Sequence, residues 1–125
     1  MRVPYDRRRP IRWLLVAGWM LAIFGFSSLQ GSMIPSSVVG YSPIAHLTEY
    51  AILAGLMVFA VGRPKISMPV ALALLLACSL YGVSDEFHQR FVAGRTPDPV
   101  DWATDTAGAG LAIAAIAVVQ RRRQR

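Results

Sequence analysis

The sequence has few charged residues and a single cysteine. Charged side chains make up 16% of its 125 residues, below the roughly 25% usual in soluble domains. Cys78 alone can form neither an intramolecular disulfide nor a thiolate metal cluster, and we expect it to be a small core residue. No glycine-rich loop is present that would cradle phosphates, so we expect no nucleotide cofactor. Basic and aromatic residues are not interleaved as in single-strand binding grooves, so we expect no nucleic-acid partner.

Long apolar runs are what the chain has instead. Hydrophobic residues make up 54% of it, and a helix needs roughly 20 mostly apolar residues to cross a bilayer. The windows that fit are 13–29, 43–62, 66–84 and 102–120. We therefore predict an all-α membrane protein whose residues 1–125 form one domain of four transmembrane helices. The first window exceeds the apolar core of a signal peptide and no clear cleavage site follows it, so we expect it to be retained.

The basic residues predict how these helices are oriented. All of them except Arg90 and Arg95 lie before the first span, between the second and third spans, or after the fourth. Loops rich in Lys and Arg stay in the cytoplasm, which predicts cytoplasmic N- and C-termini and outer loops at about 30–42 and 85–101. The basic residues on the cytoplasmic side are Arg2, Arg7, Arg8, Arg9, Arg12, Arg63, Lys65, Arg121, Arg122, Arg123 and Arg125.

Ionisable side chains gather at the predicted outer ends of the helices. Every acidic residue except Asp6 lies there, together with both histidines. Ionisable residues inside a span are costly and usually face the bundle or a wet cavity. This convergence predicts a functional site, although side chains that merely clamp the helices together would give the same pattern. Helical spacing places three sets of residues each on one helix face. They are His46, Glu49 and Tyr50; Asp85, His88 and Gln89; and Asp101, Asp105, Gly108 and Ala112.

Several chemistries suit such residues. Small residues at Gly108 and Ala112 would let a neighbouring helix approach closely. Partial burial would suit Glu49 to general acid–base chemistry. Arg90 and Arg95 could bind a phosphate, or pair with acidic residues in a solvated loop. We expect Asp85, Glu86 and Asp101 at the membrane interface. The candidate catalytic residues are His46, Glu49, Asp85, Glu86 and Asp105, and a divalent metal, if any, would be held by His46, Glu49, Asp85 and Asp105.

A serine nucleophile is a further possibility that the sequence does not support. Ser27 and Ser28 end the first span at the level of His46. No nucleophile-elbow motif surrounds either serine.

Three stretches carry a family resemblance. They are WMLAIFGFSS at 19–28, HLTEYAIL at 46–53, and YGVSDEFHQRF at 81–91, the last followed by Gly94, Arg95 and spaced aspartates. Together they resemble the VanZ-like family. The resemblance implies a small multi-pass protein of the bacterial cytoplasmic membrane, and the name-giving member is associated with teicoplanin resistance. Relatives often carry a lysine shortly before the histidine, which this chain lacks. The family's recurrent residues correspond to His46, Tyr50, Asp85, Glu86, Gln89, Arg95, Asp101 and Asp105.

The leading expectation is a cell-envelope protein whose outward-facing polar site binds a lipid-linked or cell-wall component. Tyr50, Gln89, Arg95 and Asp101 are the substrate-binding residues that the resemblance suggests. Membrane lipid would surround the helices. Two alternatives remain open at this stage. The chain could be a metal-assisted hydrolase or transferase acting on lipid head groups, or a non-catalytic partner that stabilises another membrane protein.

Overall fold

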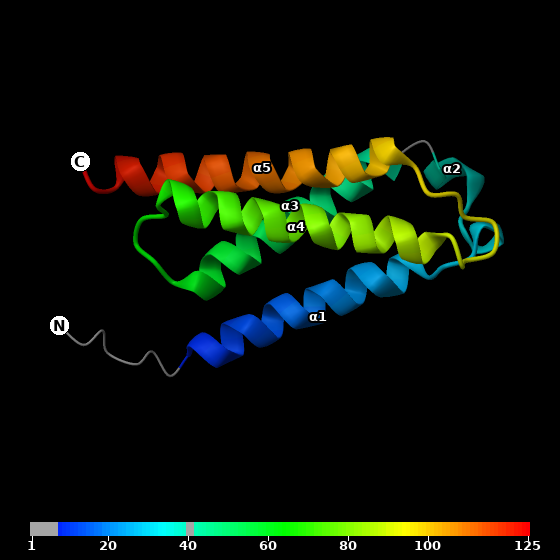
Figure 1. The fold of residues 1–125 in the computed structure, drawn as a ribbon, viewed down its shortest axis with the longest axis horizontal. Helices are drawn as coiled ribbons and strands as arrows, with labels where there is room; N and C mark the ends of the chain where they lie inside the picture. Colours follow the sequence, from blue (N-terminus) through cyan, green and yellow to red (C-terminus); the bar gives the residue numbers. More distant parts are fainter. Residues whose placement is uncertain (1–7, 40–41) are drawn as a thin grey trace.

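The chain folds into a bundle of helices, described by a computed structural model for residues 8–39 and 42–125 (Figure 1). Its four long helices are long and apolar enough to cross a membrane. No strand occurs in the described ranges. The predicted all-α fold with four spans is therefore confirmed. The long helices are α1 (Arg9–Ser27), α3 (Ser42–Val61), α4 (Met68–Gln89) and α5 (Pro99–Arg122), and the short elements are η1 (Gly31–Met33) and α2 (Ser36–Val39).

Proline marks the start of every long helix. Its fixed backbone angle suits the first turn, where the missing N–H group would have no helical acceptor. These prolines are Pro10, Pro43, Pro69 and Pro99. At the other end, Gly62 follows α3 with a φ of 66°, the left-handed conformation that commonly terminates helices. Asp98 caps α5, because its Oδ1 accepts a hydrogen bond from the Val100 N–H at 2.8 Å.

The helix boundaries differ from the hydropathy windows most at the predicted outer end. The third window ends at Ser84, whereas α4 continues to Gln89, so Asp85 and Glu86 belong to the helix rather than to the loop. The fourth helix begins at Pro99 instead of 102. Hydropathy alone treats carboxylates as water-facing. Here the Glu86 Oε2 accepts a hydrogen bond from the Asp98 N–H at 2.7 Å, so this side chain has a partner inside the protein.

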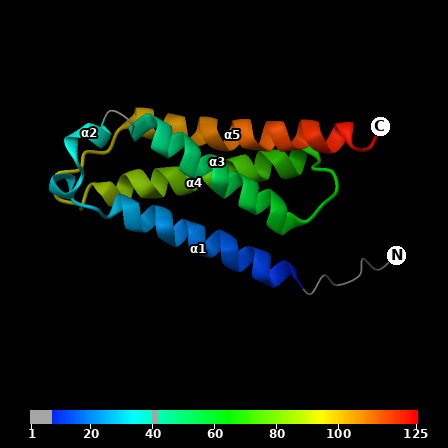
Figure 2. The same ribbon diagram turned by 180° about the vertical axis from the view of Figure 1, so that it is seen from behind.

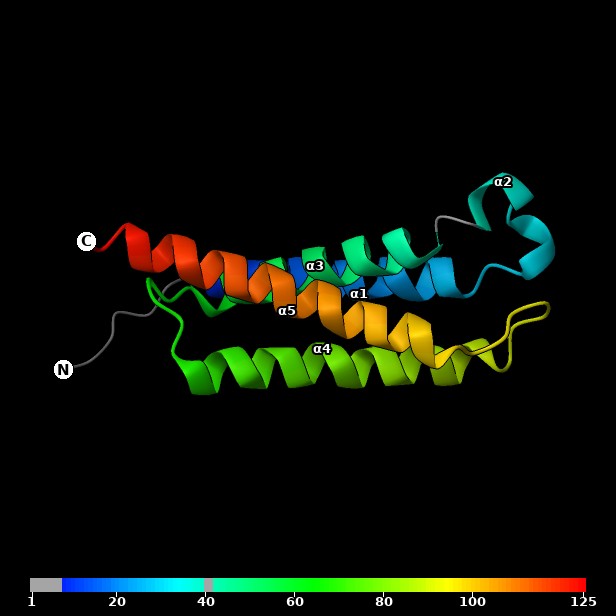
Figure 3. The same ribbon diagram turned by 90° about the horizontal axis from the view of Figure 1, so that it is seen from above.

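The helices do not pack equally. α3 shares its most extensive interface with α5, and α5 also packs along α4, whereas α1 contacts mainly α3. Figures 1 and 2 show α1 and α5 on opposite sides, with α3 and α4 between them. From above, α4 lies along the side of the bundle away from α3 (Figure 3). The start of α1 and the end of α5 lie at the same end, as an even number of spans requires.

Which side of the membrane that end faces stays a prediction from the basic residues. Three charged residues of the N-terminal segment, Arg2, Asp6 and Arg7, lie outside the described residues.

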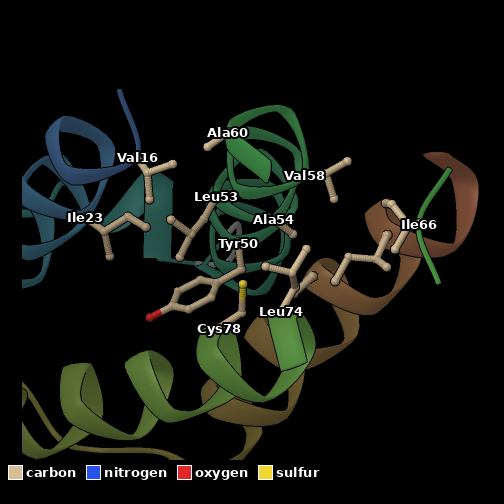
Figure 4. Close-up of a cluster of buried hydrophobic side chains, with 12 residues drawn as sticks. Val16, Ile23, Tyr50, Leu53, Ala54, Val58, Ala60, Ile66, Leu74 and Cys78 are labelled. Atoms are coloured by element: carbon tan, nitrogen blue, oxygen red, sulfur yellow. The ribbon is translucent and has the colours of Figure 1, made fainter. Parts of the chain in front are cut away.

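The apolar core centres on α3. Tyr50, Leu53 and Ala54 face Leu74 and Cys78 of α4 (Figure 4). Cys78 has no exposed surface, which confirms its prediction as a core residue. Its Sγ lies 3.6 Å from the Met57 Sδ, so the thiol has a soft, polarizable neighbour.

Gly108 allows the close approach of α5 to α3. A Cβ atom at this position would overlap the Leu47 carbonyl oxygen and lie 2.9 Å from its carbonyl carbon. No side chain fits there, so the prediction that a small residue permits close helix packing is confirmed. This crossing places the first turns of α3 and α5 against each other, where the ionisable residues lie.

Candidate functional site

His46 lies between two carboxylates of α5. Its Nδ1 is 2.9 Å from the Asp105 Oδ1, and its Nε2 is 3.5 Å from the Asp101 Oδ2. The two aspartates are four residues apart on one helix face, so they can bracket a single ring that enters from α3. His46 and Asp105 are both buried. The predicted convergence of the second and fourth spans is therefore present as direct contacts.

Glu86 completes this group from α4. His46, Glu86 and Asp105 each present one potential ligand atom, and these atoms lie within 4.8 Å of one another. Glu86 is buried rather than interfacial, contrary to the expectation from the sequence. We call His46, Glu86, Asp101 and Asp105 the carboxylate–histidine cluster. It differs from the predicted metal set, which contains Glu49 and Asp85 in place of Glu86 and Asp101.

A cavity of about 250 Å³ adjoins the cluster between α1, α3 and α4. We call it the outer cavity. Its lining combines apolar and polar side chains, and His46 belongs to both this lining and the cluster. Gln89 is fixed there, because its Nε2 donates a hydrogen bond to the Ser27 Oγ at 3.1 Å. The apolar lining residues are Ile23, Phe26, Leu29, Ile34 and Ala45, and the polar ones are Ser27, His46, Glu49, Asp85, Gln89 and Arg95.

A second hollow continues from the outer cavity toward the loops. It shares Ile34, Gln89 and Arg95 with that cavity and adds Asp101 of the cluster. Arg95 therefore stands where the two spaces meet. This position lets its guanidinium reach a ligand in either of them.

The two loops at the predicted outer end meet at a pair of glycines. The Gly31 N–H donates a hydrogen bond to the Ala93 carbonyl at 3.0 Å. A Cβ on Gly31 would lie 2.8 Å from the Gly94 carbonyl carbon, so Gly31 leaves no room for a side chain, and a Cβ on Gly94 would be tight at 3.2 Å from the Gly31 backbone. Gly94 has a φ of 74°, which favours glycine there. This loop clasp, made by Gly31, Ala93 and Gly94, fixes the backbone immediately before Arg95.

The predicted face of Asp85, His88 and Gln89 is divided in the structure. Asp85 and Gln89 line the outer cavity, whereas His88 packs against α1. Its ring stacks on Phe24 with centroids 4.3 Å apart, and its Nε2 lies 3.0 Å from the Ser28 Oγ. Ser28 therefore contacts His88 rather than His46.

Two further candidates lie away from the cluster. The Arg90 guanidinium sits over the Phe87 ring at 5.7 Å and lines neither the outer cavity nor the hollow beyond it. Tyr50 is fully buried one turn below His46, with its ring 6.2 Å from that of Tyr81. Its hydroxyl has no hydrogen-bond partner among the described residues.

Sequence reasoning missed the apolar lining of the cavity and the loop clasp. Ile23 and Phe26 look like ordinary lipid-facing residues of a span, so the sequence carries no signal for them. Gly31 and Gly94 offer a weak signal, since glycine in a loop often marks a close backbone approach. Trp19 was also missed, although its Nε1–H donates to the Glu49 carbonyl at 2.9 Å and ties α1 to α3 beside the cavity.

These features define a small multi-pass helical protein with an acidic and imidazole-bearing cluster at one end of its bundle. A family model described as VanZ/LLP1 matches residues 11–120, and the chain belongs to the VanZ/LLP1 family. The resemblance inferred from the sequence motifs is therefore confirmed. No curated protein and no solved structure matches the chain.

Proposed function

We propose that the protein acts at the outer face of the bacterial cytoplasmic membrane, where the outer cavity binds the head group of a lipid-linked or cell-wall component. The mixed apolar and polar lining of this cavity carries the proposal. An amphiphile at a membrane surface needs apolar surface for its chain and hydrogen-bonding groups for its head group, and the cavity offers both within one space.

The size of the cavity suits a head group rather than a whole lipid. Its volume of about 250 Å³ falls just below the roughly 300–1,000 Å³ of pockets that enclose drug-sized ligands. Glu49 and Asp85 can accept hydrogen bonds from hydroxyl or amino groups, and Arg95 can donate paired hydrogen bonds to a phosphate or carboxylate. A head group that carries both kinds of partner, such as a phosphorylated sugar or peptide, fits this combination.

A comparison of two outer arginines tests the proposal. Full-length protein would be reconstituted in vesicles of bacterial lipid containing a lipid-linked cell-wall precursor, and retained precursor measured by native mass spectrometry. We expect Arg95→Ala to lose at least about tenfold in retention, as the loss of a charged hydrogen-bonding partner implies. Arg90→Ala removes the same charge outside the cavity and should retain the precursor. Equal losses in both variants would mean that surface charge alone attracts the lipid.

The cellular role has its own test. We expect deletion of the gene to change teicoplanin susceptibility, with rescue by the wild-type protein and by Arg90→Ala but not by Arg95→Ala. Unchanged susceptibility of the deletion strain would refute the glycopeptide role and leave head-group binding to be judged by the reconstituted system.

Metal-assisted hydrolysis or group transfer on the bound head group is a second candidate function. The observation that favours it is the place of His46, which lies in the outer cavity wall and in the cluster with Glu86 and Asp105. Incubation of the zinc-loaded protein with the same precursor tests this candidate. Release of a head-group fragment that His46→Gln abolishes would support it, and precursor that stays intact with the wild type would rule it out.

A further inference from the structure

We propose that His46, Glu86 and Asp105 form a binding site for one divalent transition-metal ion at the predicted outer end of the bundle. Each residue comes from a different long helix, namely α3, α4 and α5. The site includes a carboxylate that the sequence placed at the membrane surface, and it leaves out Glu49 and Asp85.

The spacing of the donor atoms fits a metal centre. Two ligand atoms about 2.1 Å from a zinc ion are about 3.0 Å apart at a right angle and about 3.4 Å apart at the tetrahedral angle. The His46 Nδ1 and the Asp105 Oδ1 are 2.9 Å apart. All three donor atoms lie within 4.8 Å of one another, so small side-chain rotations would bring Glu86 to bonding distance.

Unpartnered oxygen atoms provide a second, independent observation. Asp105 has no exposed surface and Glu86 is 8% exposed, yet the Asp105 Oδ2 and the Glu86 Oε1 have no hydrogen-bond partner among the described residues. Leaving a buried carboxylate oxygen unpaired is costly, so such atoms call for a partner. The other oxygen of each group has a partner, the His46 Nδ1 for Asp105 and the Asp98 N–H for Glu86. A metal ion bound by the His46 Nδ1 would replace the proton of the first contact, so both oxygens of Asp105 would become available as ligands.

The direction of the Asp105 oxygen supports the same centre. A Cβ at Gly82 of α4 would lie 3.2 Å from the Asp105 Oδ2, so this oxygen faces α4. Glu86 follows Gly82 by four residues and projects from the same side of that helix. The two unpartnered oxygens therefore belong to side chains that meet at the α4–α5 interface.

The charge balance also favours a cation. The cluster contains only one imidazole to balance three carboxylates, those of Glu86, Asp101 and Asp105. Uncompensated charge is costly in the low-dielectric end of a membrane bundle. A divalent ion would balance it, and an imidazole nitrogen among the donors suits zinc, copper, iron or nickel better than calcium or magnesium.

Asp101 would act as a positioning residue rather than a ligand. When Nδ1 of His46 binds the metal, its proton leaves to solvent and the remaining ring proton sits on Nε2. The Asp101 Oδ2, 3.5 Å from that nitrogen, can then accept this proton in a hydrogen bond. Such carboxylate–histidine–metal arrangements orient most metal-binding histidines.

Metal titration of the full-length protein tests the site. Chelator-treated protein in detergent would receive zinc alone, with calorimetry in two buffers to count released protons, and cobalt in a parallel experiment for its visible absorption. We expect one zinc ion per chain and the release of at least one proton, from the His46 ring. Glu86→Gln and Asp105→Asn should weaken binding by at least about tenfold, as losses around metal sites usually do. Asp101→Asn should shift the cobalt band and lower the affinity without changing the stoichiometry.

Asp85→Asn is the matched control. It removes one buried carboxylate from the residue next to Glu86, but Asp85 lines the outer cavity instead of the metal site. Its zinc affinity should match the wild type. Equal weakening of zinc binding by Asp85→Asn and Glu86→Gln would mean that the acidic residues attract zinc in general and that the proposed site does not exist. If the wild-type protein elutes as folded and binds no zinc, the proposal is overturned. Protons on the carboxylates, and not a metal ion, would then neutralise the cluster. The titration contains no lipid precursor, so its outcome is independent of head-group binding.

Discussion

Substitution of Gly108 by alanine should separate the two helices that form the carboxylate–histidine cluster. The added Cβ would overlap the main chain of Leu47, lying 2.9 Å from its carbonyl carbon and 3.0 Å from its Cα. Because protein interiors are close-packed, α3 and α5 would have to move apart by about 1 Å at this point. Overpacking usually costs about 1–3 kcal/mol, and we expect the upper end because a main chain cannot rotate out of the way.

The same displacement should affect the cluster. Leu47 follows His46 and Gly108 lies one turn after Asp105, so the 2.9 Å contact between His46 and Asp105 spans the helices that would separate. Lengthening it by about 1 Å would break the hydrogen bond, since a contact beyond about 3.5 Å is no longer one. We therefore expect Gly108→Ala to lower both bundle stability and zinc affinity.

Unfolding by sodium dodecyl sulfate in mixed micelles, followed by circular dichroism, measures the stability effect. Gly55→Ala on α3 is the control, because a Cβ there meets nothing within 4 Å. We expect Gly108→Ala to lose about 3 kcal/mol and Gly55→Ala to be as stable as the wild type or more stable by up to about 1 kcal/mol, because alanine favours the helix over glycine. Equal stability of the two variants would refute the reasoning that a backbone contact sets the spacing of α3 and α5.

Three further predictions address the loops, α1 and the orientation. Gly31→Ala should open the loop clasp by pushing Gly31 away from Gly94, and so speed cleavage of the two loops by added protease. Resistance equal to that of the wild type would contradict the clasp. Tyr81→Phe should cost about 1 kcal/mol in the same detergent assay, because its hydroxyl donates to a main-chain carbonyl of α1 at 2.6 Å; an unchanged midpoint would show that this bond adds nothing. In a cysteine-free background, an impermeant maleimide should label Ser32→Cys in intact cells and Gln124→Cys only after lysis, and the reverse pattern would overturn the predicted orientation.

Hydropathy and helical spacing were enough to predict the four spans and to place the ionisable residues at one end of the bundle. Apolar runs of helical length identify the four helices, and ionisable residues within them point to one end of the bundle. The spacing of Asp101 and Asp105 placed both on one helix face, and the structure confirms that both approach His46. The need for a small residue at Gly108 was likewise readable from the sequence alone.

Tertiary contacts determine the end of α4 and the positions of Glu86 and His88, which could not be predicted from the sequence. Asp85 and Glu86 looked like loop residues because hydropathy counts a carboxylate as solvated, whereas the Asp98 N–H gives Glu86 a partner and α4 continues. The choice of Glu86 over Asp85 as a neighbour of His46 depends on the rotation of α4 about its axis. His88 packs against α1, away from Asp85 and Gln89, because its ring stacks on Phe24, a residue 64 positions earlier in the sequence.

α1 is the least buried of the four spans and packs mainly on α3. It also supplies Ile23, Phe26 and Ser27 to the outer cavity. The bundle thus divides into a firmly packed unit of α3, α4 and α5, which holds the carboxylate–histidine cluster, and a single outlying helix that closes the cavity toward the bilayer. Exchange of a bound amphiphile with the surrounding lipid would require only the parting of α1 from its neighbours. Such a passage would break the hydrogen bonds that Trp19 and Tyr81 make across the two interfaces of α1, together with the contacts of Ser27 with Gln89 and of Ser28 with His88 at its end. The cluster would keep its geometry throughout.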